Sequence, residues 1–294
     1  MNLFRAFFSS LYFLLALPVF SSDIERVIFS DWEKPPINIF YKLPKEINNK
    51  TEILFIIHGN SRNADGYIEV WASLANNKNV ILIAPEFIKS TFPNYNTLQM
   101  SSSGGKIKSD TKLYLNGSID LLFNFYRNKF NVKTDQYMIY GHSGGAQFVH
   151  RYLLMSDMPK IKKAVAANAG WYTFLGGWKF PYGIKEPPSK LSSDNLRRFL
   201  KMKLSVFIGS KDTEITSSVN QSKGANKQGA NRFQRANNFF ISSSDVAKKH
   251  NLEFNWDYKI IKGVGHSNTK MALAAAEVLL ADTTYDKQSF RKNN

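Results

Sequence analysis

The sequence predicts an α/β protein with a mostly parallel central sheet and helices on both faces. Two observations support this class. Continuous apolar runs, typical of strands buried on both faces, alternate along the chain with segments of helical spacing. One such run leads into a Gly-x-Ser-x-Gly turn at 141–145, and a helical pattern starts directly after it. This alternation requires right-handed crossovers between parallel strands. No composition break divides residues 23–294, so a single domain is expected.

The elements are expected in a regular order. Two β-prone runs at 24–29 and 37–43 flank Lys34-Pro35-Pro36 and predict an antiparallel hairpin. Apolar runs predict buried strands at 53–57, 80–85, 136–140, 163–170, 204–208 and 255–261. Apolar residues at helical spacing predict helices at 64–75, 119–130, 146–155 and 270–280.

Three segments between these elements lack a clear period. Residues 86–115 form a long polar loop, and residues 171–200 are rich in aromatics, glycine and proline. We expect the second segment to be a loop-rich cap insertion above the carboxyl edge of the sheet, where open α/β folds bind ligands. Residues 215–244 contain four basic side chains and no acidic one, and are expected to form a basic polar loop.

The first 22 residues are typical of a secretory signal peptide. Arg5 is their only charge, residues 6–20 are almost wholly apolar, and Val19-Phe20-Ser21 resembles a cleavage site. The alternative is an uncleaved membrane anchor, but the apolar run is shorter than the ~20 residues of a membrane span and contains Pro18. A secreted or periplasmic protein is therefore expected.

Composition limits the chemistry and the partners. The 294 residues include no cysteine, which excludes disulfides, thiolate metal sites and a cysteine nucleophile. The net charge of +16 favours electrostatic association with anionic surfaces or substrates. The basic residues are spread out and form no nucleic-acid arm, so a bias of composition is the favoured explanation and no specific nucleic acid is expected.

The turn at 141–145 places a serine where a nucleophile is needed. Gly141 and Gly145 keep side chains away where strand and helix crowd together, and Gly144 leaves its N–H open to a substrate oxygen. A serine hydroxyl needs an adjacent base that a carboxylate holds in turn. His266 follows the last predicted strand and can reach the serine over the carboxyl edge of the sheet. We therefore predict Ser143 as nucleophile and His266 as base.

The acid and the oxyanion donors follow from similar positions. Asp212 comes directly after a buried strand in Gly-x-x-Asp and is the expected acid, with Glu214 and, inside a strand, Asp257 as competitors. An oxyanion needs two preorganised donors. The N–H groups of Gly144 and of Asn60, in the turn after strand 53–57, are expected to supply them. The histidines show no metal-ligand spacing, so neither a metal nor a cofactor is expected.

Substrate contacts are harder to predict. The aromatic residues Trp171, Tyr172 and Trp178 of the insertion are candidates for an acyl or aromatic pocket, although a surface loop tucked down by its own aromatics would look the same. Arg232 and Arg235 could bind a substrate carboxylate, although two ordinary solvated arginines are the favoured interpretation.

These motifs together resemble the α/β-hydrolase superfamily, in which nucleophile, acid and base follow in this order. The resemblance runs from His58-Gly59-Asn60 through the serine turn and Asp212 to His266. Within the superfamily the chain is most similar to secreted esterases grouped with poly(3-hydroxybutyrate) depolymerases and feruloyl-esterase-like enzymes. Polymer depolymerases of that group generally carry a linker and a substrate-binding module after the catalytic domain, and this sequence ends shortly after its closing helix, so the resemblance implies a soluble ester as substrate.

Three functions remain open on the sequence. The first is a secreted or periplasmic serine esterase acting through an acyl-enzyme on small soluble esters. The second is a serine peptidase with the same triad, which would want an acidic site for a free amino terminus. The third is a basic binding protein on a hydrolase scaffold, which would not need serine, acid and base in order. The oligomeric state cannot be read from the sequence.

Overall fold

The central sheet has eight strands. The computed structural model describes residues 24–284, so the predicted signal peptide at 1–22 lies outside the described residues. The strands follow the order β1-β2-β4-β3-β5-β6-β9-β10 across the sheet. Their bounds are β1 Ile24–Phe29, β2 Ile37–Lys42, β3 Glu52–Ile57, β4 Val80–Glu86, β5 Tyr137–His142, β6 Ile161–Ala167, β9 Leu204–Gly209 and β10 Asp257–Ile261.

The sheet is mostly parallel, as predicted. β1 and β2 form the expected antiparallel hairpin, and β2 pairs antiparallel with β4. Every pair from β4 to β10 is parallel. Because all of these parallel strands point the same way, the residues that follow β3, β5, β9 and β10 meet at one edge of the sheet.

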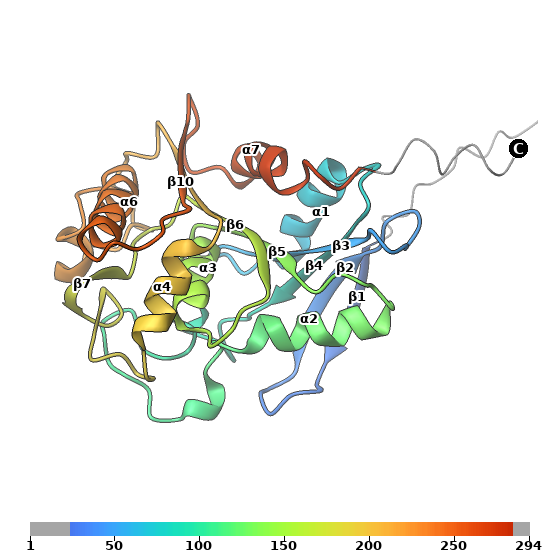
Figure 1. Cartoon of the computed structure of the whole chain (residues 1–294), viewed down its shortest axis with the longest axis horizontal. Coiled ribbons are helices and arrows are strands. Elements are labelled where there is room, and N and C mark those ends of the chain that lie inside the picture. Colours follow the sequence, from blue (N-terminus) through green and yellow to red (C-terminus); the bar gives the residue numbers. More distant parts are fainter. Residues whose placement is uncertain (1–23, 285–294) are drawn as a thin grey trace, which may run out of the picture.

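Helices cover both faces of the sheet (Figure 1). α1 (Ala64–Leu74) and α7 (Asn268–Leu279) lie on one face, while α2 (Ser118–Lys129), α3 (Gly144–Met155), α4 (Ser193–Lys201) and α6 (Arg232–Lys249) lie on the other. β3 shows why two cores form. Ile53, Phe55 and Ile57 belong to the core under α2 and α3, whereas Leu54 and Ile56 belong to the core under α1 and α7.

The cap insertion has regular structure of its own. Residues 171–200 contain the two-stranded sheet of β7 (Phe174–Lys179) and β8 (Gly183–Lys185), and the first eight residues of α4. α4 begins with a capping box, in which the Ser192 hydroxyl accepts from the Asn195 N–H and the Asn195 side chain accepts from the Ser192 N–H.

The prediction of a basic polar loop over 215–244 is wrong from Arg232 onward. The 18-residue helix α6 begins there, with Asn231 as N-cap accepting from the Gln234 N–H. Its buried residues include Ala236, Phe239, Ser243 and Ala247, which recur at helical spacing. Three of these four are small or polar, so the apolar stripe is weak in the sequence. Residues 223–226 form the short helix α5 (Lys223–Asn226), and the rest of 215–231 has no regular element.

The long segment after β4 is held in place mainly by the side chain of Arg62. It contains two short 3₁₀ turns, η1 (Tyr95–Thr97) and η2 (Thr111–Leu113). Arg62, in the turn after β3, donates to the carbonyl oxygens of Phe87, Phe92 and Pro93, and its guanidinium stacks on the Tyr95 ring with 4.1 Å to the centroid. The segment therefore closes over the turn that follows β3.

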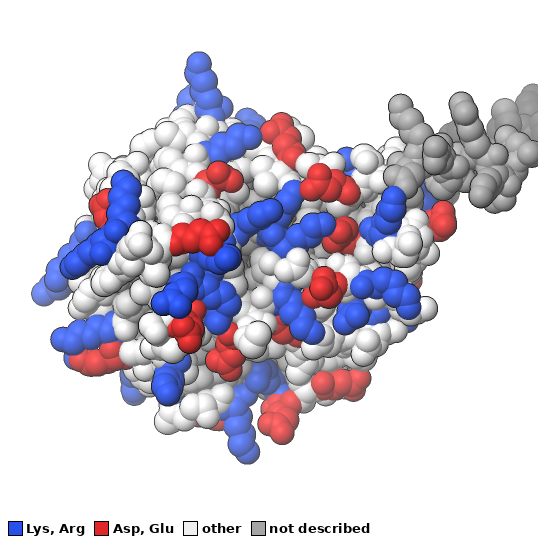
Figure 2. Space-filling view, viewed as in Figure 1, with Lys and Arg blue, Asp and Glu red and all other residues white. Residues whose placement is uncertain are grey.

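Two kinds of feature are absent from residues 24–284. Within this range no helix is long and apolar enough to cross a membrane, and no cluster of three His, Asp or Glu side chains could hold a metal ion. Figure 2 shows one face of the molecule, with Lys and Arg side chains dispersed among Asp and Glu side chains and without a broad patch of one sign.

Candidate active site

Ser143 occupies a strained turn between β5 and α3. Its φ of 57° and ψ of −115° lie outside the favoured regions for an L-residue. Two backbone hydrogen bonds hold it there: its N–H donates to Ala167 O at 2.9 Å, and its carbonyl accepts from the Gln147 N–H at 3.1 Å. The neighbouring strand and the following helix together fix a conformation that the residue would not adopt alone.

The two flanking glycines are required by close backbone contacts. A Cβ atom on Gly141 would lie 2.3 Å from Gly145 O, and one on Gly145 would lie 2.1 Å from Ile57 O. Both distances are far below van der Waals contact, so no side chain fits at either position. The Gly-x-Ser-x-Gly spacing thus allows α3 to cross directly over the ends of β3 and β5.

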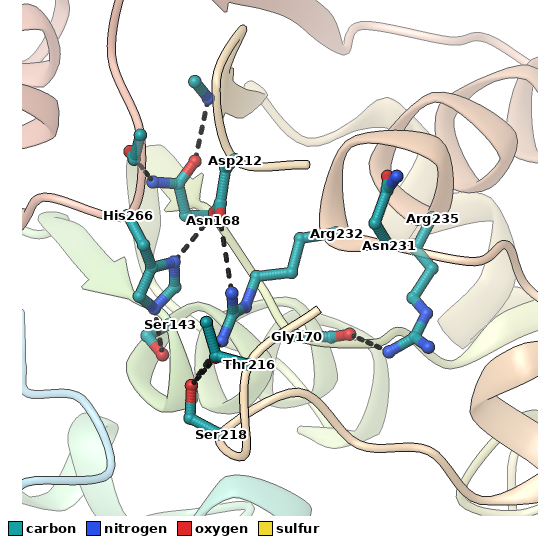
Figure 3. Close-up of polar contacts among 12 residues, drawn as sticks. Ser143, Asn168, Gly170, Asp212, Thr216, Ser218, Asn231, Arg232, Arg235 and His266 are labelled. Carbon is teal, nitrogen blue, oxygen red and sulfur yellow. Dashed lines mark hydrogen bonds and ion pairs between the residues drawn. The ribbon is translucent and has the colours of Figure 1, made fainter. Parts of the chain in front are cut away.

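Ser143, His266 and Asp212 form one line of hydrogen bonds (Figure 3). His266 Nε2 lies 2.9 Å from Ser143 Oγ, and His266 Nδ1 lies 2.7 Å from Asp212 Oδ2. The Asp212 side chain is buried at 3% exposure, whereas that of His266 is 28% exposed. The three residues follow β5, β9 and β10, so the parallel strands bring together side chains that are 69 and 54 residues apart.

Neither competing acid bonds His266 within residues 24–284. Glu214 is exposed and only lines the hollow beside His266. Asp257 begins β10, at the opposite edge of the sheet from His266. The structure therefore pairs His266 with Asp212, as the sequence predicted.

Asn168 ties together the loops that carry the acid and the base. It is fully buried with a φ of 52° directly after β6. Its Oδ1 accepts from the Gly209 N–H at 2.8 Å, and its Nδ2 donates to Gly265 O at 3.0 Å. Gly209 lies three residues before Asp212, and Gly265 directly precedes His266. One amide thus sets the spacing of both loops.

His142 packs beside the predicted base. Its ring centroid lies 4.7 Å from that of His266, and its Nδ1 is 3.0 Å from the Tyr67 hydroxyl. Burial holds the pKa of His142 well below its ordinary value, with the charges of His266 and Arg232 acting in the same direction. His142 is therefore uncharged near neutral pH and does not repel an imidazolium at His266.

The predicted oxyanion donors lie next to Ser143. A Cβ atom on Gly59 would be 3.5 Å from Ser143 Cβ, and one on Gly144 would be 2.3 Å from Asn60 Oδ1, so the turn after β3 packs against the serine turn. Within residues 24–284, neither the Gly144 N–H nor the Asn60 N–H donates a hydrogen bond. Both groups remain available to a substrate oxygen.

Two hollows flank this line of residues. One, of about 300 Å³, is lined mainly by amide and hydroxyl side chains together with Trp171. Its polar lining consists of Asn60, Asn96, Ser103, Gln147, Ser217, Ser218 and Asn220. The other, of about 450 Å³, lies on the side of His266 and Asp212 and also includes Ser218. The site therefore offers hydrogen-bonding surfaces on both sides of the serine.

The structure places the three aromatic side chains predicted to contact substrate in three different surroundings. Trp171 lines the hollow beside Asn60. Tyr172 is fully buried, stacks on Phe239 with 4.4 Å between centroids, and cannot touch a substrate. Trp178 lines a separate hollow between β7 and α6. For these last two residues the structure contradicts the expectation, because the cap folds its aromatic side chains onto α6 instead of into the site.

Arg232 is neither solvated nor directed at an open pocket. Its side chain is 3% exposed and donates through Nη1 to Asp212 Oδ1 at 3.1 Å. The guanidinium therefore already has a carboxylate partner, and that partner is the residue predicted as the triad acid. The expectation of a substrate-binding Arg232 is replaced by a buried ion pair inside the site.

The sequence did not identify all of the residues that shape this site. The sequence pattern predicts Asn168 only as part of a small-residue strand. A polar residue at the carboxyl end of such a strand, beside the serine strand, is nevertheless a usable signal. The ion pair between Arg232 and Asp212 could not be predicted from the sequence, because the two residues are 20 positions apart and Arg232 begins a helix that the sequence did not predict.

Solved structures place this arrangement among known proteins. No protein-family model and no curated protein matches the chain. Poly(aspartic acid) hydrolase-1 from Sphingomonas sp. KT-1 matches with a TM-score of 0.81 and 32% identity, over 87% of this chain and 98% of that one. The chain belongs to the α/β-hydrolase superfamily. Within the superfamily it falls in the esterase and depolymerase-like group.

Two further neighbours support the same fold. A poly(3-hydroxybutyrate) depolymerase from Bordetella parapertussis matches this α/β-hydrolase with a TM-score of 0.80 and 23% identity, over 90% of this chain and 92% of that one. S-formylglutathione hydrolase from Staphylococcus aureus matches with a TM-score of 0.57 and 13% identity, over 88% and 98%. The α/β-hydrolase fold is confirmed, and the chain is a hydrolase.

Proposed function

We propose that this α/β-hydrolase is an exported serine esterase that cleaves carboxylic esters of small soluble substrates through an acyl-enzyme. One observation carries the proposal, namely the unbroken line of hydrogen bonds from Ser143 Oγ through His266 to Asp212. A serine hydroxyl is a poor nucleophile without a base in contact with it, and a base is held in the right orientation by a buried acid.

The acylation half-reaction follows from this geometry. Ser143 Oγ attacks the ester carbonyl carbon while its proton passes to His266 Nε2. The carbonyl oxygen becomes an oxyanion that accepts from the N–H groups of Gly144 and Asn60. Asp212 stabilises the imidazolium formed at His266. The imidazolium then protonates the alcohol oxygen, the C–O bond breaks, and the acyl group stays on Ser143.

Deacylation repeats the same steps with water. His266 Nε2 accepts a proton from a water molecule whose oxygen attacks the acyl carbon. The tetrahedral intermediate again has its oxyanion at Gly144 and Asn60. Return of the proton to Ser143 Oγ releases the carboxylic acid and restores the free enzyme. The partly exposed His266 side chain lets water reach this position.

The hollow beside Asn60 supports a small polar substrate. Its walls are mainly amide and hydroxyl groups, and the apolar side chains in its lining, Trp171 and Val219, are themselves buried. A long alkyl chain would leave those groups without hydrogen-bond partners, which costs free energy for each polar group desolvated. We therefore expect acetate and butyrate esters to be better substrates than decanoate esters.

The test combines an active-site probe with a series of esters. We expect a fluorophosphonate to label the wild-type protein and p-nitrophenyl esters to turn over, with labelling and turnover both lost in Ser143→Ala. In Asp212→Asn, kcat should fall by about 10³- to 10⁴-fold, because the imidazole loses its orienting carboxylate. Ser143→Ala retaining full turnover would refute the proposal. A wild type that binds anionic polymers but turns nothing over would support the binding-protein alternative instead.

A second candidate is hydrolysis of amide bonds in an acidic polymer. The neighbour at 32% identity is named a poly(aspartic acid) hydrolase. In this chain, Arg151 is a fully buried guanidinium that bonds Thr173 Oγ1 and the carbonyl oxygens of Asn96 and Gln147, and it has no carboxylate partner among the described residues. Burial lowers the pKa of Arg151 to about 9, so it is still charged at neutral pH.

This unpaired charge lies close to the hollow beside Asn60. The Arg151 guanidinium stacks on Trp171 with 3.9 Å to the ring centroid, and Trp171, Asn96 and Gln147 all line that hollow. A buried cation without a counterion favours an anion nearby. The net charge of +16 would add attraction at long range.

Activity assays with poly(aspartic acid) and with p-nitrophenyl acetate as substrates distinguish amide hydrolysis from ester hydrolysis. Size-exclusion chromatography and amine release report cleavage of the polymer, with Ser143→Ala as control. Polymer cleavage that exceeds ester turnover and weakens as salt is raised would put the amide reaction first. No cleavage of the polymer beside rapid ester turnover would leave the esterase.

Export is part of the proposal. Expression of the full chain in a bacterial host, followed by fractionation and amino-terminal sequencing, tests it. A mature amino terminus near Ser21 or Ser22 in the periplasm or medium is the expected result. An intact amino terminus in the membrane fraction would identify an anchor instead.

A further inference from the structure

Arg232 reaches the predicted triad acid from a different layer of the molecule. It is the first residue of α6, which packs on the face of the sheet opposite α7. The N-cap Asn231 fixes the start of this helix, and the side chain of Arg232 then extends toward the loop after β9 (Figure 3). The α6 backbone contacts the same loop, because the Phe233 N–H donates to Asp212 O at 3.3 Å.

The Asp212 carboxylate is held from two sides. One oxygen, Oδ1, accepts from Arg232 Nη1 at 3.1 Å, and the other, Oδ2, lies 2.7 Å from His266 Nδ1. Arg232 Nη2 also donates to Ser218 Oγ at 2.9 Å, and Ser218 in turn bonds the Thr216 hydroxyl. The guanidinium therefore fixes both the plane of the carboxylate and the path of the chain beyond it.

Two opposite charges lie close together beside His266. Asp212 and Arg232 are each 3% exposed, so their charges are desolvated and interact strongly. The titratable or charged side chains that face His266 or share its hollow are Asp212, Arg232, His142, Lys211 and Glu214. His142 is uncharged, and Lys211 and Glu214 are exposed, of opposite sign and screened by water. Asp212 and Arg232 thus dominate the field at the imidazole.

We propose that Arg232 is a positioning residue that orients the Asp212 carboxylate toward His266 and offsets part of its negative charge. The inference rests on the proposed roles of Ser143, His266 and Asp212. Helix α6 thereby helps to hold Asp212 in position relative to His266 and Ser143. Because Arg232 offsets part of the charge of Asp212, the imidazolium formed at His266 during turnover is less stabilised than it would be beside an unpaired carboxylate.

Three variants test this role. Arg232→Met removes the charge and both donors while keeping an apolar side chain, and Arg232→Lys keeps the charge but cannot bond Asp212 and Ser218 in the same fork. Arg235→Met is the matched control: Arg235 is also a buried guanidinium of α6, but it donates to Gly229 O, Gly170 O and Asn226 Oδ1. Steady-state kinetics with p-nitrophenyl acetate are normalised to sites titrated with a fluorophosphonate, so that misfolded molecules are not counted.

For Arg232→Met we expect kcat per titrated site to fall about 10- to 100-fold with little change in KM, because the carboxylate is no longer held in register. The acidic limb of the pH profile of kcat/KM should move to higher pH by about one unit, since an unpaired carboxylate stabilises the imidazolium and so keeps the base protonated to higher pH. Arg232→Lys should leave the acidic limb of the pH profile at its wild-type pH, and its kcat should fall less than that of Arg232→Met. Arg235→Met should lower the melting temperature without moving the limb.

Three outcomes would overturn the proposal, and the third matters only if Arg232→Met is insoluble. A wild-type kcat and pH profile per titrated site in Arg232→Met would leave Arg232 a structural residue only. A rise in KM confined to carboxylate-bearing esters would return it to substrate binding. If Arg232→Met gives no soluble protein, Arg232→Lys decides, because an unchanged kcat in that variant excludes a positioning role. Ser143-dependent turnover in the wild type shows in each case that the proposed function stands while this inference fails.

Discussion

At the residue scale, the site depends on two glycines, where no side chain fits, as much as on the residues whose side chains form its hydrogen bonds. Ser143 needs its strained backbone, and the absence of a Cβ at Gly141 and Gly145 permits it. The grouping of Ser143, Asp212 and His266 could be predicted because the sequence shows their order along the chain and their positions after strands. The orientation of Arg232 could not, since it depends on where a helix starts and how that helix packs.

Gly145→Ala tests this exclusion. The new Cβ would meet backbone atoms of Ile57 and His58, which cannot move like the end of a flexible side chain. We expect the free energy of unfolding to fall by about 3 kcal/mol, at the upper end of the overpacking range. Urea unfolding measures it. Gly176→Ala is the control, because a Cβ at Gly176 would meet nothing within 4 Å, and equal losses in the two variants would contradict the explanation.

At the element scale, predictions succeeded where burial on both faces produced a strong pattern. β3 and β4 are continuous apolar runs, and the sequence located them to within a residue at each end. α6 was missed because asparagine, serine and alanine occupy much of a helix whose buried stripe is narrow. The aromatics of the cap were recognised, but a list of aromatic residues does not say which of them face the substrate and which face α6.

At the scale of the whole molecule, three histidines are buried in neutral form. Burial lowers the pKa of His58 to about 4 and those of His142 and His150 well below the ordinary value. His58 Nε2 accepts from the Phe87 N–H, so its Nδ1 carries the proton and donates to Gly59 O. Protonation of His58 would break the bond that holds the segment after β4.

The stability of the folded protein should therefore fall on acidification. At pH values more than about one unit above 6.5 these histidines are neutral whether the chain is folded or not, and they contribute no pH dependence. As the pH falls from 6.5 toward 4, the unfolded chain binds protons that the folded chain does not, so the folded state loses free energy relative to it. His58 alone contributes about 3 kcal/mol over this interval.

Urea unfolding at pH 7, 6, 5 and 4 measures this loss, and His58→Gln isolates one site. Glutamine keeps an acceptor for the Phe87 N–H and a donor for Gly59 O but does not titrate. The slope of unfolding free energy against pH should decrease in this variant by up to about 1.4 kcal/mol per pH unit, the value for one proton. The same slope in His58→Gln and wild type would mean that His58 is not buried in neutral form.

The amide of Asn168 has a consequence for how such an enzyme can diversify. It bonds the backbone on both sides of the gap between Gly209 and Gly265, and no residue of the cap takes part in either bond. Changes of length in the two loops it joins would displace acid and base relative to each other, whereas insertions within residues 174–191 leave this pair of bonds intact. Insertions in the cap can therefore arise without changing the spacing of Asp212 and His266, and the loop lengths after β9 and β10 are the ones that selection should keep constant.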